Sequence, residues 1–271
     1  LSCAKKADGI ILGPVDYNAY PHKPAGGINP SGALRIGLDL YANIRPAKNY
    51  KNVKSLSKSI DLIIVRENTE GFYADRNMAE GNGEFSPVTG VGLALRKITE
   101  KASTRIAKTA FEIASSRLRS NPKEQVVHSI HKANVMRLTD DIFLDACKNV
   151  DSQYKNINYE EMVVDACAAH IVRNPSQFDV IVTTNMFGDI LSDLATELSG
   201  SLGLAGSLNA GDNYAMAQAQ HGSAPDIAGK NIANPISLIL STSMLLNWIG
   251  KKQKIQNLIL ASDLLDKSVT S

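Results

Sequence analysis

The sequence predicts an α/β protein built in two lobes, and three observations support that prediction. Short runs rich in β-branched residues alternate with longer helical patterns, as is typical of α/β folds. The chain has 271 residues, which is long enough for a large core and two lobes. No G-x-G-x-x-G fingerprint occurs, so a Rossmann fold is not expected.

Five runs are predicted as strands because they combine β-branched residues with short length. They are GIILG (9–13), DLIIVR (61–66), EQVVHSI (124–130), NYEEMVVD (158–165) and FDVIVTTN (178–185). Helices are predicted over 98–118 and within 183–194. The apolar stretch 235–250 contains Ser, Thr and Asn residues and is shorter than the roughly 20 residues of a membrane span, which indicates a buried helix.

Two stretches, 14–32 and 206–234, are dense in Gly, Pro, Asn and Ser and are predicted as loops. Loops of this length in a compact protein are usually functional or disordered. Residues 77–93 place turn residues between strand formers, as a projecting hairpin would. That hairpin is interpreted either as a dimer arm or as an ordinary surface hairpin.

The composition argues against two classes of partner. The formal net charge is only +2 and the basic residues are dispersed, which argues against binding to nucleic acid or to an anionic membrane. Cys3, Cys147 and Cys167 lie far apart without metal-ligand spacing, which favours a reducing compartment. A cytoplasmic location is expected, with the mitochondrial matrix left open. The chain opens without Met and almost at a strand, so a truncated start is also expected.

Two aspartates stand four positions apart at the start of the predicted helix in TTNMFGDILSDL. Asp189 and Asp193 share a helix face, where like charges repel by roughly a few tenths of a kcal/mol unless a cation lies between them. Carboxylate oxygens are the ligands that Mg²⁺ and Mn²⁺ prefer. The alternative is that the acidic residues favour the helix macrodipole, which explains one aspartate better than two.

Other charged residues stand near polar or aromatic partners, and Arg66 also ends a predicted strand. Arg35, Arg45 and Arg66 could form the cluster that a polycarboxylate substrate needs, although each alone is more typical of a surface ion pair. Lys132 follows a predicted strand, and Asp165 stands at a strand-to-helix turn. Asp165 with the two aspartates above would supply enough carboxylates for a divalent ion.

The stretch HGSAPDIAGKNIANP (221–235) has the features of a nucleotide-binding loop. Gly222, Ser223 and Gly229 allow close backbone approach, and His221 can stack or donate. Asp226 can accept hydrogen bonds from a ribose diol and would repel a 2′-phosphate, which favours NAD over NADP. The alternative interpretation is a long turn before the helix that starts near residue 235.

Six motifs occur in an order and spacing that together resemble one family, the β-decarboxylating isocitrate and 3-isopropylmalate dehydrogenases. They are LDLYANIRPAK, VRENTEGFY, HKANVMR, VDACAAHIV, NMFGDILSDL and HGSAPDIAGKNIANP, and the resemblance covers nearly all of the residues. The chain lacks the family's opening strand and glycine-rich segment and stops early, so part of the first lobe is expected to be missing. Gln218 stands where many members have Glu.

This resemblance implies roles and boundaries for particular residues. Tyr73 and Lys132 would form the acid/base pair, and Asp165, Asp189 and Asp193 would hold Mg²⁺ or Mn²⁺. Substrate contacts would come from Arg35, Arg45, Arg66, Asn29, Ser31 and Asn134. NAD would contact His221, Gly222, Ser223, Ala224, Pro225, Asp226, Ile227 and Asn234. Residues 1–40 and 200–271 would form an incomplete cofactor lobe, and 41–199 a substrate and dimerisation lobe with its hairpin arm near 77–93.

The expected function is NAD- and metal-dependent oxidative decarboxylation of a 3-carboxy-2-hydroxy acid. In the family the lysine and the first aspartate reach the neighbouring subunit's site, so at least a homodimer with shared sites is expected. Asn29 and Ser31 favour a polar distal group, as in isocitrate, homoisocitrate or tartrate and malate. The alternatives are 3-isopropylmalate dehydrogenase of leucine biosynthesis and a catalytically silent partner subunit. Retention of the complete catalytic and metal set favours the enzyme.

Overall fold

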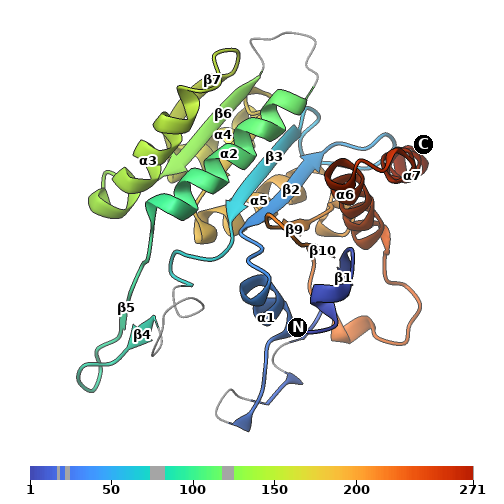
Figure 1. Cartoon of the computed structure of the whole chain (residues 1–271), viewed down its shortest axis with the longest axis horizontal. Coiled ribbons are helices and arrows are strands. Elements are labelled where there is room, and N and C mark those ends of the chain that lie inside the picture. Colours follow the sequence, from blue (N-terminus) through green and yellow to red (C-terminus); the bar gives the residue numbers. More distant parts are fainter. Residues whose placement is uncertain (17–18, 22–24, 74–82, 118–124, 271) are drawn as a thin grey trace.

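A mixed eight-stranded sheet forms the centre of the molecule, with helices on both faces (Figure 1). The computed structural model describes residues 1–16, 19–21, 25–73, 83–117 and 125–270. The strand order is β1-β10-β9-β2-β3-β8-β6-β7, which confirms the α/β prediction. Within these ranges, no helix has the length and apolarity needed to cross a membrane.

The elements have the following bounds. The main-sheet strands are β1 (Ile10–Leu12), β2 (Ala42–Lys48), β3 (Asp61–Glu67), β6 (Val126–His131), β7 (Asn158–Val163), β8 (Val180–Thr183), β9 (Leu208–Ala210) and β10 (Ala215–Gln218). The α-helices are α1 (Pro30–Gly37), α2 (Glu100–Ser116), α3 (Arg137–Asp151), α4 (Val164–Arg173), α5 (Asn185–Ser199), α6 (Ile236–Gln253) and α7 (Gln256–Thr270). Short 3₁₀ helices span η1 (Ala4–Lys6), η6 (Pro175–Gln177), η7 (Leu202–Leu204) and η8 (Pro225–Ile227).

The parallel strands β3, β8, β6 and β7 are formed by the apolar runs seen in the sequence. Both faces of this part of the sheet are covered, which is why β3 and β8 read as continuous hydrophobic segments. On one face Val65 and Val180 pack with Phe111 of α2. On the other, Ile64 and Ile181 pack with Leu191 of α5. The site residues therefore stand on a rigid three-layer core.

Strand β2 holds a proline inside a central position of the sheet. Pro46 pairs with Ile63 of β3, but the pairing of β2 with β9 runs only from Ala42 to Ile44. Proline cannot donate to a strand ladder, so it is tolerated here because β9 has already ended.

The prediction of a continuous loop over 206–234 is wrong, because β9 and β10 lie inside it. Their Ala, Asn and Gln residues have weak strand propensity and stand among turn formers, which hid them in the sequence. They form because their small side chains pack beneath Leu245 and Ile249 of α6. The loop predicted over 14–32 also ends early, at the start of α1, and residues 17–18 and 22–24 lie outside the described ranges.

The short strands β4 (Glu84–Phe85) and β5 (Leu93–Ala94) pair antiparallel. Figure 1 shows this hairpin projecting away from the body of the molecule. Residues 77–82 of the predicted arm lie outside the described ranges. The hairpin's use as a dimer arm therefore stays a prediction.

The division into two lobes also stays a prediction. Strands from 1–40 and 200–271 occupy one end of the sheet as β1, β10 and β9. The other five strands of this sheet come from 41–199. The two groups meet where β9 pairs with β2.

Candidate active site

The sheet brings the motif residues to one end. In the parallel register, Arg66 of β3 and Ile130 of β6 both stand beside Thr183 of β8. The residues after these strands therefore emerge together, in the place where α/β sheets bind ligands. Lys132 follows β6, and Asp165 lies in the first turn of α4 after β7.

Arg45 and Arg66 meet the paired aspartates in a charged cluster between the sheet and α5. Arg45 Nη1 lies 3.2 Å from both Asp189 Oδ1 and Asp193 Oδ1, and it donates to Ser192 Oγ at 2.7 Å. Arg66 Nη1 is ion-paired with Asp189, and its Nε and Nη2 donate to Asn185 Oδ1 at 2.9 and 2.6 Å. The positive charges of Arg45 and Arg66 therefore offset the repulsion between the two aspartates.

Burial sets the electrostatics of this cluster. Arg45 is 7% exposed, and this burial, together with the neighbouring Arg66 charge, lowers the pKa of Arg45 to about 10. Asp189 and Asp193 oppose that shift. A carboxylate ligand delivered here would be bound by cations that are screened little by water.

Arg35 lies in the last turn of α1, against neutral acceptors. Its Nη2 donates to Gln218 Oε1 at 3.1 Å and its Nη1 to Asn68 Oδ1 at 3.3 Å. Ser31 Oγ donates to the same Gln218 oxygen at 3.1 Å. Asn29 caps α1 by accepting from Gly32 N at 3.2 Å. Asn29 and Ser31 thus have partners within the chain, so their hydrogen bonds do not require a polar substrate.

Lys132 and Asp165 form a separate ion pair, with Lys132 Nζ 2.5 Å from Asp165 Oδ1. The bond from Lys132 lowers the pKa of the exposed Asp165 carboxyl. The backbone N of Lys132 donates to the buried Asp140, which is also ion-paired with Arg96. Asn134 is exposed in the turn that follows.

The donor set fits a hard divalent cation in part. Asp189 and Asp193 lie one helical turn apart, with side chains 38% and 51% exposed, and their recorded contacts run through Oδ1. Within the described ranges, no three His, Cys, Asp or Glu side chains gather closely enough to hold a metal ion. Asp165 is therefore not grouped with the other two carboxylates within the described part of one chain.

The loop after β10 is exposed and has room beside its backbone. A Cβ added to Gly222 or Gly229 would meet no atom within 4 Å. Ala224 takes the left-handed conformation, at φ 45°, just before η8, which holds Pro225, Asp226 and Ile227. His221 Nδ1 lies 2.9 Å from the neighbouring Gly222 carbonyl oxygen, Ser223 is exposed, and Asn234 Oδ1 accepts from Ile236 N. These features fit a loop that receives a nucleotide.

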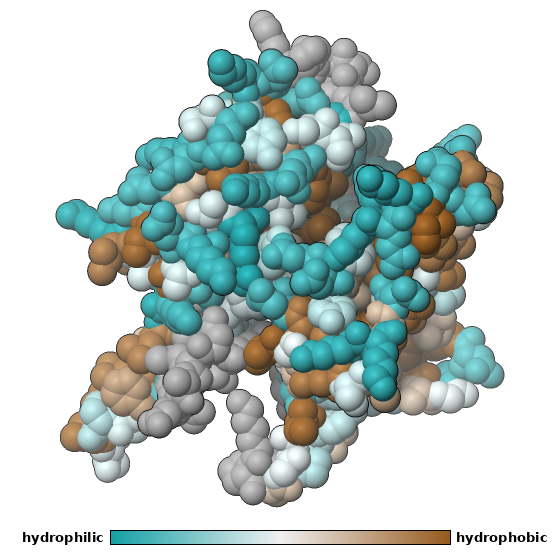
Figure 2. All heavy atoms as spheres, in the orientation of Figure 1, coloured by the Kyte–Doolittle hydropathy of each residue, from teal (hydrophilic) through white to brown (hydrophobic). Residues whose placement is uncertain are grey.

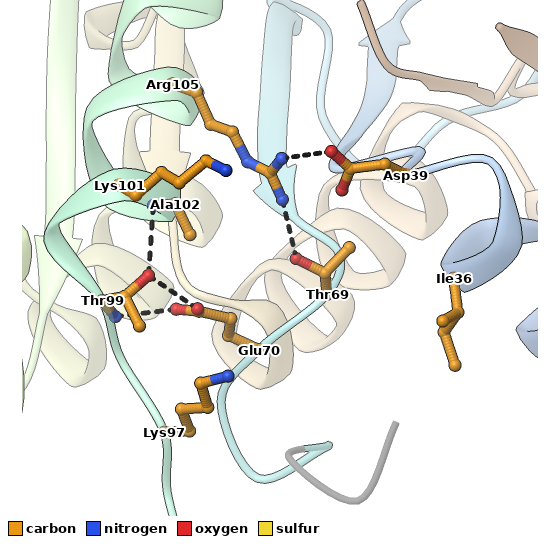
Figure 3. Close-up of a pocket in the computed structure, with 9 residues that line it drawn as sticks. All are labelled: Ile36, Asp39, Thr69, Glu70, Lys97, Thr99, Lys101, Ala102 and Arg105. Atoms are coloured by element: carbon orange, nitrogen blue, oxygen red, sulfur yellow. Dashed lines mark hydrogen bonds and ion pairs between the residues drawn. The ribbon is translucent and has the colours of Figure 1, made fainter. Parts of the chain in front are cut away.

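Tyr73 follows the turn after β3, and the Arg66 guanidinium lies 5.8 Å from its ring centroid. Thr69 and Glu70 of this turn line a cavity of about 340 Å³, which Figure 3 shows. There Glu70 accepts from both Thr99 N and Thr99 Oγ1, at 2.8 and 2.7 Å. Arg105 bonds Thr69 and Asp39. This lining fixes the segment that carries Tyr73.

Several residues of the site were missed by the sequence analysis. Asn185 binds Arg66, Asn68 binds Arg35, Ser192 binds Arg45, and Gln220 Nε2 donates to Asp193 Oδ1 at 3.0 Å. Asn185 and Ser192 stand inside TTNMFGDILSDL, and Asn185 precedes Asp189 by four positions on the same helix face. That spacing is a usable signal. No local pattern marks Gln220.

Comparisons with known proteins match most of the chain to one family. The family model described as isocitrate/isopropylmalate dehydrogenase matches residues 1–269. A 3-isopropylmalate dehydrogenase of Saccharolobus solfataricus is 45% identical over 99% of this chain and 73% of its own length. An isocitrate/homoisocitrate dehydrogenase of Thermus thermophilus is 47% identical over 86% of this chain and 65% of its own length. The crystal structure of isocitrate dehydrogenase from Methylococcus capsulatus superposes with a TM-score of 0.77 at 39% identity, covering 89% of this chain and 68% of that one.

Proposed function

The chain belongs to the isocitrate/isopropylmalate dehydrogenase family, and we propose that it serves the NAD- and Mg²⁺- or Mn²⁺-dependent oxidative decarboxylation of a 3-carboxy-2-hydroxy acid. One observation carries this proposal: Arg45 and Arg66 converge on Asp189 at the end of the sheet. Two buried cations beside carboxylates provide for an anionic substrate and for a cation in the same place.

In this proposal the arginines bind the substrate carboxylates and so orient the substrate in the site. Lys132, contributed by a second copy, relays the proton from the C2 hydroxyl as that carbon becomes a ketone. The carboxylate β to the ketone then leaves as CO₂, because its electron pair can pass toward the carbonyl. Tyr73 donates a proton to the resulting enol carbon.

Residues of this chain are also assigned to the two groups that would bind. Asp189 and Asp193, with Asp165 of a second copy, would hold the divalent ion, and the loop 221–234 would hold NAD. When bound, the dinucleotide accepts hydride from C2, and the cation withdraws electron density from the hydroxyl and carboxylate oxygens. The exposed carboxylate of Asp226 favours NAD over NADP.

The substrate class remains the finer part of the proposal. We favour isocitrate, homoisocitrate or an acid of the tartrate and malate type, because Asn29 and Ser31 are polar and favour a polar distal group on the substrate. The internal partners of these two side chains strengthen 3-isopropylmalate as the alternative. The printed names of the relatives include both kinds of acid.

A direct assay tests the proposal. The purified natural protein is supplied with NAD and Mn²⁺ and with isocitrate, homoisocitrate, tartrate, D-malate or 3-isopropylmalate, and NADH formation is measured. We expect turnover of at least one acid, slower turnover with NADP, and no activity in Lys132→Ala. Absence of turnover on all five acids would favour the silent partner subunit instead.

A further inference from the structure

We propose that Asn185 is a positioning residue that sets the direction of Arg66 and the path of the chain leading to Tyr73. This inference rests on the proposed function, because it concerns how the same site receives a substrate carboxylate. Asn185 is the first residue of α5 and is 0% exposed. Its side-chain amide joins Arg66 of β3 to the turn that follows the same strand.

The oxygen of this amide holds one edge of the Arg66 guanidinium. Asn185 Oδ1 accepts from Nε at 2.9 Å and from Nη2 at 2.6 Å, while Asp189 takes Nη1. Of the five N–H donors of a guanidinium, these contacts use three, which leaves two to meet a ligand. Because Asn185 is neutral, it orients Arg66 without cancelling its charge.

The nitrogen of the amide holds the turn after β3. Asn185 Nδ2 donates to Glu70 O at 3.0 Å. Gly71 follows at φ 84°, and a Cβ there would lie 3.3 Å from Asn185 Cβ, so glycine permits both the turn and the close approach. The Glu70 carboxylate is in turn fixed by Thr99 (Figure 3). Asn185 therefore sets the start of the segment that places Tyr73.

The Arg66 side chain packs closely against the adjacent turn of α5. A Cβ added to Gly188 would lie 2.6 Å from Arg66 Cγ and 2.7 Å from its Cβ. Beside it, Thr184 Oγ1 accepts from Arg96 at 3.2 Å, which fixes the residue preceding α5. The Arg66 side chain is thus directed along α5, and the Asn185 amide decides which guanidinium edge faces the ligand.

The test compares two Asn→Asp changes of the same shape. Asn185→Asp removes the donor to Glu70 and adds negative charge beside Arg66. Asn49→Asp is the matched control, because the Asn49 amide likewise makes three hydrogen bonds, and its three go to the backbone of Ser57, Ile60 and Ser199 and not to an arginine. Steady-state kinetics, binding of D-malate and of the best-used acid by calorimetry, and Tm are measured on the purified natural protein.

We expect Asn185→Asp to raise KM and Kd for the hydroxy acid about tenfold, because the added carboxylate competes with the substrate for the Arg66 charge, with KM for NAD unchanged. Asn49→Asp lowers Tm alone. In an Arg66→Lys background, the Asn185 change adds little, because both changes act through the same contact between Arg66 and Asn185. The inference is overturned if the two Asn→Asp changes raise KM equally, or if the effects of Asn185→Asp and Arg66→Lys add fully. In either case, turnover by the wild-type protein still supports the proposed function. If the wild-type protein binds an acid without turning it over, Kd alone decides. A wild-type protein that neither binds nor oxidises any of the acids overturns both.

Discussion

At the residue scale, the paired aspartates are explained by their partners. Arg45 lies against Asp189 and Asp193 at equal distance, so the negative charges are balanced by a buried cation before any metal ion binds. Removing Arg45 alone would leave two neighbouring carboxylates without that balance. The cluster is therefore poised to exchange interactions when substrate and cation bind.

Asp193→Asn tests the metal role of one of these carboxylates. The change keeps the shape of a half-exposed side chain but removes a charge, so we expect the Mn²⁺ concentration for half-maximal activity to rise about tenfold or more. Tm should stay within about 2 °C, since Asp189 still pairs with Arg45 and an amide oxygen can still accept from Gln220. Glu197→Gln, one turn further along α5, is the control. An unchanged Mn²⁺ response would remove Asp193 from the metal shell.

The motif residues could be predicted from sequence, but their mutual contacts could not. Arg66 and Asp189 belong to two distinct motifs, and that they meet depends on β3 pairing with β8. Gln218 was noted only as a departure from the family. Its role as the shared acceptor of Ser31 and Arg35 depends on contacts across more than 180 positions of the chain. Such pairings leave no periodic trace in a single sequence.

At the element scale, strands buried on both faces were predictable and those of small residues were not. β3 and β8 carry long β-branched runs, whereas β9 and β10 consist largely of residues with weak strand propensity. The weak strands form because β2 and α6 flank them. Tertiary packing therefore decided the part of the sheet that leads into the predicted NAD loop.

A buried histidine in β6 makes the stability of the folded protein depend on pH. His128 is 1% exposed, its ring lies edge-on to Phe178, and burial lowers its pKa against the opposing charges of Glu160 and Asp179. The unfolded chain takes up the proton first as pH falls below about 6.5. The stability contributed by neutral His128 is thus present above that pH and is lost as pH falls through the folded-state pKa. We expect Tm to fall between pH 7 and pH 5, and less so in His128→Gln. His170→Gln should keep the wild-type slope; equal slopes in all three proteins would contradict this.

At the scale of the whole molecule, one chain holds the parts of a site without closing it. The arginine and aspartate cluster lies at β2, β3 and α5, while Lys132 and Asp165 pair with each other after β6 and β7. The projecting hairpin is apolar as well, since Phe85, Leu93 and Leu95 are each more than 40% exposed, and Figure 2 shows hydrophobic atoms gathered over it. Large exposed apolar patches are commonly sites of interaction with another protein chain. Both features support a pair of chains that share their active sites.

Mixing two inactive variants tests that arrangement. Lys132→Ala and Arg66→Ala each damage one half of a shared site, so a dimer made of one chain of each kind contains one site with both halves intact. If chains pair at random, half of the dimers are mixed, and about a quarter of wild-type activity should return. Mixing Arg45→Ala with Arg66→Ala is the control, because both changes lie in the same half and every site stays damaged. NADH formation after co-refolding reports the result. If mixed dimers are shown to form and neither mixture recovers activity, each chain builds its site alone.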